Sequence, residues 1–529
     1  MRPDLPGPSP GSKFIMSGLD AVPRARRAGA GFDPRPSSWE GCSMKAGLFL
    51  AFVFLAGLPA PADASRPNFI FFISDDISQE DHGCYGHPVI RTPEIDRLAA
   101  TGMRFDRAYL TISSCSPTRC SIITGRYPHN TGAPELHSQL PDDQIRFPEL
   151  LREAGYYTAL SGKNHMFKKG DRAFDRMAPG GEPGGSSDWV EILRDRPGDQ
   201  PFFFWFAAYD AHRGWKVSDH APEYDPSEVV VPPYLFDGPE TRKDLALYYH
   251  EVSRFDHFVG RVRAELEKQG ILDNTFLVVA SDNGRPFPRA KSRLYDSGIK
   301  TPWVVHYPKI IKEGAVTQSF VSVIDLSATC LELAGVEIPE CIQGQSFVPI
   351  LRDPQATVRE VVFAEQNWHV YRNHSRLVRW GDFAYIRNNF PDQMNLCSES
   401  DTTYPSGKEL WKAVAGGCGS ENFWQTFSNP HPGEELYDLG KDPHQLTNLA
   451  GQEARAAAVR QGRELLAQWT RQTGDTLPEN PTPSRHGPPR IVDGTVLGWE
   501  RGPGGNPHAE FPGAAREATR IDHPGPLRP

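Results

Sequence analysis

The sequence predicts an α/β fold, in which a large and mostly parallel sheet is flanked by helices and accompanied by a smaller antiparallel sheet. Three continuous apolar runs are typical of strands buried on both faces of a parallel sheet: residues 68–73, 202–208 and 275–280. The long stretch at 241–269 carries one apolar stripe and predicts a helix that covers this sheet. Gly270 follows it and is expected to end the helix.

Shorter elements complete the predicted fold. We expect further strands at 105–110, 156–160 and 301–307, and helices at 92–102, 147–154, 322–334 and 453–471. Residues 178–200 are rich in Gly, Pro and Asp and predict a loop. After about residue 360 the pattern changes to short strand candidates separated by turns, at 361–363, 376–380 and 383–386. These short runs predict the smaller antiparallel sheet.

Length and charge bound the organisation of the chain. At 529 residues, it has room for one large and one small domain, which we place at 65–360 and 361–475. Residues 476–529 are rich in Pro, Gly and charge, and predict a poorly ordered or surface-draped tail. The net charge of -9 argues against a general nucleic-acid binder, although local basic residues can still bind an anion.

The N-terminus predicts an export signal. Residues 44–64 combine a basic start, an apolar run at 47–58 and a small-x-small cleavage site that ends at Ala64. The run is short for a membrane span, so we expect an exported protein (periplasmic, secreted or lysosome-like) without a stable span. Residues 1–43 are polar and rich in Gly, Pro and Arg, which is unusual for a segment in front of an export signal. We therefore expect translation to begin at Met44. A peptide of the precursor from upstream of Met44 would refute this.

Export makes disulfides possible. The cysteine pairs nearest in sequence are expected to bond: Cys330 with Cys341, and Cys397 with Cys418. Spacing alone does not fix connectivity. The chain has no Cys-x-x-Cys pair, so a cysteine-based zinc site is not expected.

Acidic and amide side chains follow two of the buried runs. Asp75 and Asp76 come just after the first run, and Asp282 and Asn283 come just after the third. The carboxyl ends of parallel strands meet at one edge of a sheet, where α/β folds place their ligands. These hard oxygen ligands suit Ca²⁺ or Mg²⁺ better than zinc, and an irregular cage with several carboxylates favours calcium. The alternative for Asp75 and Asp76 is a turn with a helix cap.

Basic side chains follow two other strands. Lys163 and His165 come after the strand candidate at 156–160, and His212 comes after the second buried run. Taken alone, such residues are more often solvated or structural. At the same sheet edge as the acidic residues, they predict a polar site that binds an anion.

The stretch at 114–126 predicts a loop that enters a helix, with Pro117 in the first turn. The N-terminus of such a helix suits an anion. Arg119 lies about one turn after Cys115, and a thiol beside a cation at a helix N-terminus is expected to ionise easily and to be reactive. The alternative is a buried structural cysteine with a surface arginine.

The pattern Cys115-x-Pro117-x-Arg119, followed by Thr124-Gly125-Arg126, resembles the signature of the type I sulfatases. The order of the other motifs is similar too: Asp-Asp, then Gly-Lys-x-His, then a lone His, then Asp-Asn-Gly and finally Glu-Leu-Tyr-Asp-Leu. The resemblance covers about residues 66–450. It implies an alkaline-phosphatase-like fold, with the catalytic domain at 65–360 and a C-terminal subdomain.

Within this family the chain is most similar to the heparan N-sulfatase (sulfamidase) branch. The local similarities lie at residues 113–117, 210–213 and 281–288, although Ala211 replaces the proline that the branch usually has. In that branch a basic residue shortly after Pro-Phe-Pro contacts the sulfate. Lys291 is its counterpart here, and Arg293 and Lys300 are close rivals.

The resemblance also implies a mechanism. Cys115 would be oxidised to formylglycine by a formylglycine-generating or other sulfatase-maturating enzyme. A calcium ion held by Asp75, Asp76, Asp282, Asn283 and residue 115 would activate the hydrate of that aldehyde for attack on sulfur. Asp282 would accept its proton.

The remaining roles follow from the same resemblance. Lys163 and Lys291 would hold the sulfate oxygens, and Arg119 would hold the hydrate and help position the metal ligands. His212 would protonate the leaving oxygen or nitrogen. His165 would take a proton from the second hydroxyl, which would expel sulfate and restore the aldehyde.

Three functions fit the sequence. The favoured one is a sulfatase acting on a sulfated glycan, with an N-sulfoglucosamine of the heparan or heparin type ahead of an O-sulfated polysaccharide. The second is a phosphatase, phosphodiesterase or phosphonate hydrolase of the same wider fold. The third is an inactive, sugar-binding relative. The sequence does not give the exact sugar, exo or endo action, or the oligomeric state.

Overall fold

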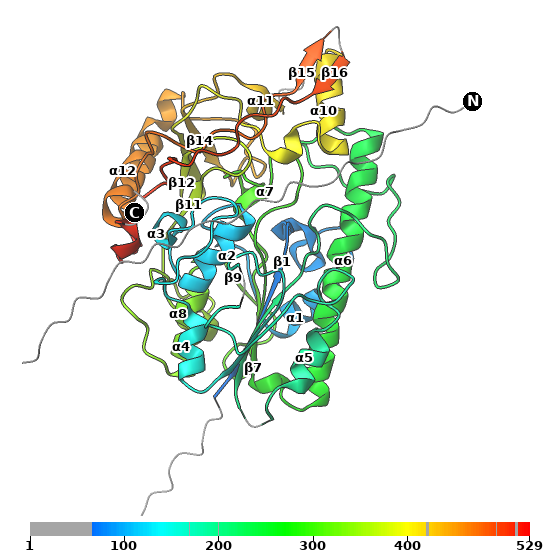
Figure 1. The fold of residues 1–529 in the computed structure, drawn as a ribbon, viewed down its shortest axis with the longest axis vertical. Coiled ribbons are helices and arrows are strands. Elements are labelled where there is room, and N and C mark those ends of the chain that lie inside the picture. Colours follow the sequence, from blue (N-terminus) through cyan, green and yellow to red (C-terminus); the bar gives the residue numbers. More distant parts are fainter. Residues whose placement is uncertain (1–65, 169, 199, 419–422, 493–494, 514–516) are drawn as a thin grey trace, which may run out of the picture. The chain divides into compact units, whose positions relative to one another are not determined.

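An eight-stranded sheet forms the centre of residues 66–529, which the computed structural model describes except for 169, 199, 419–422, 493–494 and 514–516 (Figure 1). Its order is β5-β4-β6-β1-β7-β8-β2-β9, and only the two pairings of β8 are antiparallel. The strands are β1 (Asn68–Ser74), β2 (Met103–Phe105), β4 (Tyr157–Gly162), β5 (Arg176–Ala178), β6 (Phe202–Ala207), β7 (Thr275–Ser281), β8 (Val304–His306) and β9 (Ala315–Thr317). The expectations for 1–43 and for the signal peptide at 44–64 concern residues outside this description.

Helices cover both faces of the sheet (Figure 1). On one face lie α1 (Pro93–Thr101), α5 (Trp189–Asp195) and α6 (Pro239–Lys268), and on the other α2 (Cys115–Thr124), α4 (Phe147–Glu153) and α8 (Asp325–Ala334). The apolar run of β1 serves both faces, because side chains alternate along a strand. Phe69 and Phe71 enter the core under α2 and α8, whereas Ile70 and Phe72 enter the core under α6. The predicted parallel α/β sheet is therefore confirmed.

Two local predictions were wrong. The single strand expected at 105–110 is split into β2 and β3 (Ala108–Tyr109), because β3 leaves the main sheet to pair with β10 (Val321–Ser322). The loop expected at 178–200 contains α5, whose Trp189 and Ile192 are fully buried in the core under α6. The apolar side chains of α5 outweigh the glycines and prolines around it.

The smaller sheet is antiparallel, as predicted. Its order is β11-β12-β13-β14, with bounds β11 (Val361–Gln366), β12 (Ser375–Trp380), β13 (Phe383–Asn388) and β14 (Glu434–Asp438). Helix α12 (Ala456–Thr473) covers one face. Val361 and Phe363 pack toward α12, whereas Val362 and Ala364 pack into the main core. Both faces of the smaller sheet are therefore buried, and the face away from α12 shares one hydrophobic core with the main sheet.

Short elements complete the described residues. They are α3 (Pro128–Thr131), α7 (Asp296–Ile299), α9 (Val348–Arg352), α10 (Pro405–Ala415), α11 (Trp424–Phe427), β15 (Arg490–Val492) and β16 (Thr495–Gly498). Among the described residues, no helix is long and apolar enough to cross a membrane.

The expected disulfides are absent from the described residues: Cys330, Cys341, Cys397 and Cys418 all carry free thiols. Cys330 points into the main core from α8 and Cys341 is only half-buried, while Cys397 is buried and Cys418 is exposed. Proximity in sequence was a poor guide because the partners of each pair lie in different environments.

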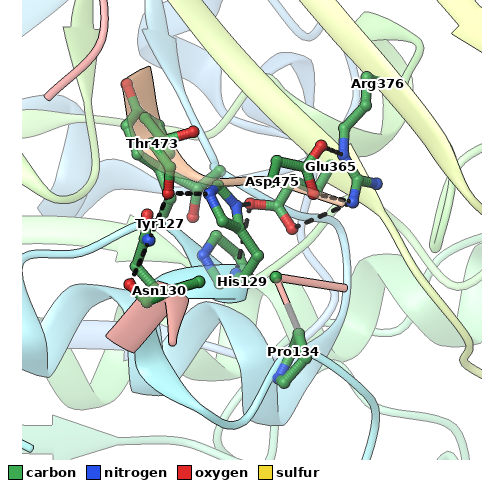
Figure 2. Close-up of polar contacts among 12 residues, drawn as sticks. Tyr127, His129, Asn130, Pro134, Glu365, Arg376, Thr473 and Asp475 are labelled. Atoms are coloured by element: carbon green, nitrogen blue, oxygen red, sulfur yellow. Dashed lines mark hydrogen bonds and ion pairs between the residues drawn. The ribbon is translucent and has the colours of Figure 1, made fainter. Parts of the chain in front are cut away.

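A buried polar network joins α3 and the smaller sheet to the end of α12 (Figure 2). The ring nitrogens of His129 lie 2.6 Å from Glu365 Oε1 and 3.2 Å from the carbonyl oxygen of Thr473. Arg376 donates two hydrogen bonds of 2.7 Å to the carboxylate of Asp475. Each buried charge therefore has a partner of opposite charge or a hydrogen-bond acceptor.

The described part of the C-terminal tail is held against this region. Asn130 donates a hydrogen bond of 2.8 Å to the carbonyl oxygen of Ala518. Arg126 donates to the carbonyl oxygens of Thr519 and Ile521 at 3.0 and 2.9 Å. The tail thus lies along the surface and anchors on the corner between α2 and α3.

We expect Arg376→Ala to lower the free energy of unfolding by about 3–5 kcal/mol, because it leaves the buried Asp475 without its partner. Denaturant unfolding measures this loss. Arg372→Ala is the matched control, since Arg372 pairs with the exposed Asp392 and is expected to cost less than about 1 kcal/mol. Equal losses in the two variants would contradict a stabilising role for the network.

Candidate active site

Paired strand ends create a buried carboxylate cluster. Strands β1 and β7 run parallel with Ser74 opposite Ser281, so the residues that follow them lie side by side. Asp75 and Asp76 leave β1 there, and Asp282 leaves β7, and all three side chains are fully buried. Their oxygens and the Sγ of Cys115 lie within 4.8 Å of one another. The structure thus brings these predicted ligands together.

Helix α2 begins at Cys115 and carries its thiol to the cluster. The Sγ lies 3.5 Å from Asp75 Oδ1 and 4.0 Å from Asp76 Oδ1. Burial, and then the charge of Asp75, raise the pKa of the Cys115 thiol well above its ordinary value. The prediction of an easily ionised thiol was therefore wrong, because the surrounding carboxylates and burial outweigh the helix N-terminus.

Arg119 lies one turn further along α2 and is fully buried rather than on the surface. Its Nε donates to Asp282 Oδ2 at 2.8 Å, and its Nη1 donates to the carbonyl oxygen of Lys163 at 3.0 Å. The guanidinium therefore connects α2 to the ends of β7 and β4. It is placed to position the groups around residue 115.

Two ammonium groups bind the outer oxygens of the cluster. Lys163 Nζ pairs with Asp75, and Lys291 Nζ pairs with Asp76 Oδ2 at 2.7 Å. Burial alone would lower the pKa of each lysine. The adjacent carboxylate and the other negative groups of the site outweigh burial, so the pKa of both lysines is raised. For Asp75, burial is likewise outweighed by Lys163, which holds the pKa of Asp75 well below its usual range.

The structure distinguishes the three rival cations of the loop after β7. Lys291 alone of the three contacts the cluster. Arg293 Nη1 instead donates to Asn395 Oδ1 at 2.5 Å. Lys300 lines a separate cavity of about 480 Å³. The resemblance therefore pointed to the residue that the fold places at the site, although spacing alone left the choice open.

Both predicted histidines line the cavity that opens onto the cluster. His165 Nε2 lies 2.8 Å from Nδ1 of His137, and burial, followed by the charge of Lys163, lowers the pKa of His165 to about 3. His212 is exposed, and the charge of the Lys291 ammonium is the main reason that its pKa is lowered to about 4. Both rings are therefore neutral near pH 7 when no anion is bound.

The cavity has a volume of about 600 Å³, within the range of roughly 300–1,000 Å³ that small-molecule sites span. Its polar lining residues include Asp75, Lys163, His165 and His212. Its other residues include the apolar Met177, Ala178 and Pro179, and the aromatic Tyr209.

Sequence reasoning missed two histidines beside this site. His137 contacts His165, and its backbone N–H donates to Ser116 Oγ at 2.8 Å. His369 Nδ1 lies 2.8 Å from Oγ of Ser114, the residue before α2. Neither follows a strand of the main sheet, so the search for polar residues at strand ends did not reach them.

The cluster fits a divalent cation. Burial raises the pKa of Asp76 and of Asp282, and the neighbouring carboxylates raise both values further. The site therefore disfavours three negatively charged carboxylates that no cation neutralises. The buried side-chain oxygen of Asn283 has no hydrogen-bond partner among the described residues. A hard cation would supply charge to the carboxylates and a partner to this oxygen.

Comparison with known proteins agrees with this geometry. The model of the family described as Sulfatase matches residues 67–184 and 186–336, which contain the whole cluster. The chain belongs to the sulfatase family. It is an enzyme that hydrolyses sulfuric esters.

Relatives place this sulfatase near the sulfamidase branch. N-sulphoglucosamine sulphohydrolase from Homo sapiens is 30% identical over 481 residues, which cover 78% of this chain and 91% of the relative. An ulvan-active sulfatase from Formosa agariphila is 28% identical over 474 residues, covering 78% of this chain and 77% of the relative. A protein solved in complex with its substrate, D-glucosamine-2-N,6-O-disulfate, shares the fold with a TM-score of 0.61 at 22% identity, covering 77% of this chain and 98% of that one.

Proposed function

We propose that this sulfatase removes sulfate from a sulfated glycan, and that N-sulfoglucosamine of the heparan or heparin type is its substrate. The observation that carries the proposal is the placement of the Cys115 thiol 3.5 Å from Asp75, with Lys163 and Lys291 on the outer side of the carboxylates. A sulfate that approaches residue 115 meets both ammonium groups. The similarity to human N-sulphoglucosamine sulphohydrolase supports the choice of sugar.

We further propose that Cys115 is converted to formylglycine by a sulfatase-maturating enzyme and that the cluster holds calcium. The hydrated aldehyde would supply the oxygen that attacks sulfur. A calcium ion would supply positive charge that lowers the pKa of that oxygen. Asp75, Asp76, Asp282 and Asn283 would hold the ion together with residue 115.

The side chains around the cluster would then divide the remaining tasks. Lys163 and Lys291 bind the sulfate oxygens and stabilise the negative charge that develops on them. Asp282 accepts a proton, and Arg119 holds Asp282 in place through the hydrogen bond of 2.8 Å. The oxyanion donors are positioned before the substrate arrives, so they need little reorganisation during the reaction.

The two histidines transfer protons on opposite sides of the sulfate. His165 is neutral, so a ring nitrogen lone pair can accept a proton beside residue 115. An anionic sulfate bound to Lys291 offsets the charge that lowers the pKa of His212, so substrate binding favours the protonated ring. Protonated His212 can then donate to the leaving oxygen or nitrogen of the sugar.

A prediction separates the rival cations. We expect Lys291→Ala to lower kcat/KM by about 100- to 1,000-fold, because a buried donor to the sulfate oxygens is lost. Lys300→Ala is the matched control and is expected to stay within about twofold of the wild-type value, since Lys300 lines the other cavity. A larger loss in Lys300→Ala than in Lys291→Ala would reassign the sulfate-binding cation.

The test of the function is sulfate release from a panel of substrates. The panel contains N-sulfoglucosamine, O-sulfated sugars, a sulfated polysaccharide of the ulvan type, a phosphate monoester and a phosphonate monoester. The proposal expects the highest kcat/KM for the N-sulfated sugar. A higher kcat/KM for an O-sulfated sugar would overturn the choice of sugar and favour an O-sulfated glycan. A higher kcat/KM for the phosphorus esters would overturn the proposed function. Calcium binding without turnover of any substrate would overturn it as well.

We also propose that the protein is exported before it acts. The support is the signal-like segment at 44–64 in the sequence. N-terminal sequencing of the mature protein tests this, and a mature chain that begins upstream of residue 44 would contradict it.

A further inference from the structure

Tyr209 is an exposed aromatic residue inside the catalytic cavity. It follows β6, and the relative solvent exposure of the residue is 43%. Most large apolar residues of the described chain are less exposed than this. It lines the same cavity as Lys163, His165 and His212. Single exposed aromatics are common on protein surfaces, but one that shares a cavity with catalytic groups is available to the substrate.

The backbone around Tyr209 is held from both sides. Its N–H donates to the carbonyl oxygen of Gly184 at 2.8 Å, and its own carbonyl oxygen accepts from the N–H of His212 at 2.8 Å. The ring lies against Gly185, where an added Cβ would come within 2.4 Å of Tyr209 Cδ2. Gly185 has a φ of +73°, so this close approach and this backbone both require glycine. The ring is therefore fixed in position before a substrate binds.

The surroundings of Tyr209 are chemically divided. The same cavity is lined by the Lys163 ammonium and the imidazole of His212, and by the apolar Met177, Ala178 and Pro179. The Tyr209 hydroxyl forms no hydrogen bond among the described residues. The ring, and not a polar contact, is thus the main feature that this residue presents to the cavity.

A sulfated sugar has the same division. Its sulfate is anionic, whereas the C–H groups of a pyranose ring form weakly positive apolar faces. The face of an aromatic ring carries partial negative charge and large apolar area, so it attracts such C–H groups. A sulfate held by Lys163 and Lys291 leaves the attached sugar inside the same cavity as Tyr209.

We propose that Tyr209 determines substrate specificity by stacking against the C–H face of the sulfated sugar. This inference rests on the proposed function of the same site. On this proposal, one aromatic side chain allows the enzyme to distinguish a sulfated saccharide from an inorganic sulfate anion. The lysines recognise the sulfate, and Tyr209 recognises the ring that carries it.

The test compares Tyr209→Ala, Tyr209→Leu and Tyr209→Phe with the wild type. Removal of the ring is expected to raise KM for the sulfated saccharide by about tenfold and to change kcat by less than about threefold. Tyr209→Leu retains much of the apolar volume without the aromatic face, so it also raises KM. Tyr209→Phe keeps the face and is expected to retain the wild-type KM. The inhibition constant of inorganic sulfate is expected to be the same in all four proteins, because this anion has no C–H face.

Thermal unfolding of each variant shows whether the ring serves only to support the turn at Gly185. Equal KM values for wild type and Tyr209→Ala on a saccharide that the wild type hydrolyses would overturn the stacking and leave the proposed function intact. An equal rise of KM in Tyr209→Phe would assign the effect to the hydroxyl and overturn it too. A wild type that releases sulfate only from esters without a sugar would overturn both proposals.

Discussion

Cys115→Ala is expected to lower turnover by at least about 10,000-fold while the protein stays folded, because it removes the group that the proposed mechanism converts to the nucleophile. The variant has no thiol beside Asp75 to convert, so it also lacks the ligand that the converted side chain would supply to the proposed calcium ion. No neighbouring group can replace it, since Asp75 and Asp76 are already paired with ammonium groups. Sulfate release and thermal unfolding measure the two parts of this expectation.

Cys120→Ala is the matched control for this variant. Cys120 is a fully buried cysteine of the same helix, and it packs in the main core instead of at the cluster. We expect a small loss of stability and turnover within about twofold of the wild type. The mass of the tryptic peptide of residues 108–119 completes the test: an unmodified thiol in active enzyme, made in a host with the maturation machinery, would contradict the formylglycine proposal.

Asp282→Asn is expected to abolish the stabilisation by calcium and to lower turnover by at least about 100- to 1,000-fold. In the wild type, calcium at 100 times its Kd is expected to stabilise the fold by about 2.7 kcal/mol, and a chelator is expected to reverse this. The substitution keeps the shape of the side chain but removes a negative charge from the cluster. It also replaces the charge partner of Arg119. Thermal unfolding with and without calcium measures the effect.

Asp256→Asn controls for the loss of a buried carboxylate. Asp256 accepts hydrogen bonds from the backbone N–H groups of Glu94 and Ile95 at the start of α1, away from the cluster. Its replacement is expected to lower stability by about 1 kcal/mol and to leave the response to calcium unchanged. A normal calcium response in Asp282→Asn would remove Asp282 from the proposed ligand set.

The sequence was most informative where strands end. The continuous apolar runs identified β1, β6 and β7, and the side chains after them meet because these strands are parallel and adjacent. The short strand candidates separated by turns likewise identified β11, β12 and β13 of the smaller sheet. Such patterns depend on local spacing, which the sequence displays directly.

Features that depend on distant contacts were harder to predict. The choice of Lys291 over Arg293 depends on how the loop after β7 folds, and spacing alone does not encode that path. The raised pKa of Cys115 results from carboxylates that arrive from two other strands. The role proposed for Tyr209 depends on a cavity wall at 177–185, which starts in β5 beside β4 and ends where Gly184 accepts a hydrogen bond from Tyr209.

The anchoring of the C-terminal tail on the corner after α2 has a consequence for the timing of maturation. Ala518 and Ile521 are synthesised about 400 residues after Cys115, which corresponds to roughly 20–80 s of translation at about 5–20 residues per second. Until then the corner at Arg126 and Asn130 lacks hydrogen bonds that it has in the finished fold. In the folded protein only 2% of Cys115 is exposed, so an enzyme that modifies this thiol must reach it during that interval or before the chain closes. The segment around Ala518 and Ile521 is therefore expected to limit how long the Cys115 thiol stays accessible to the proposed maturating enzyme.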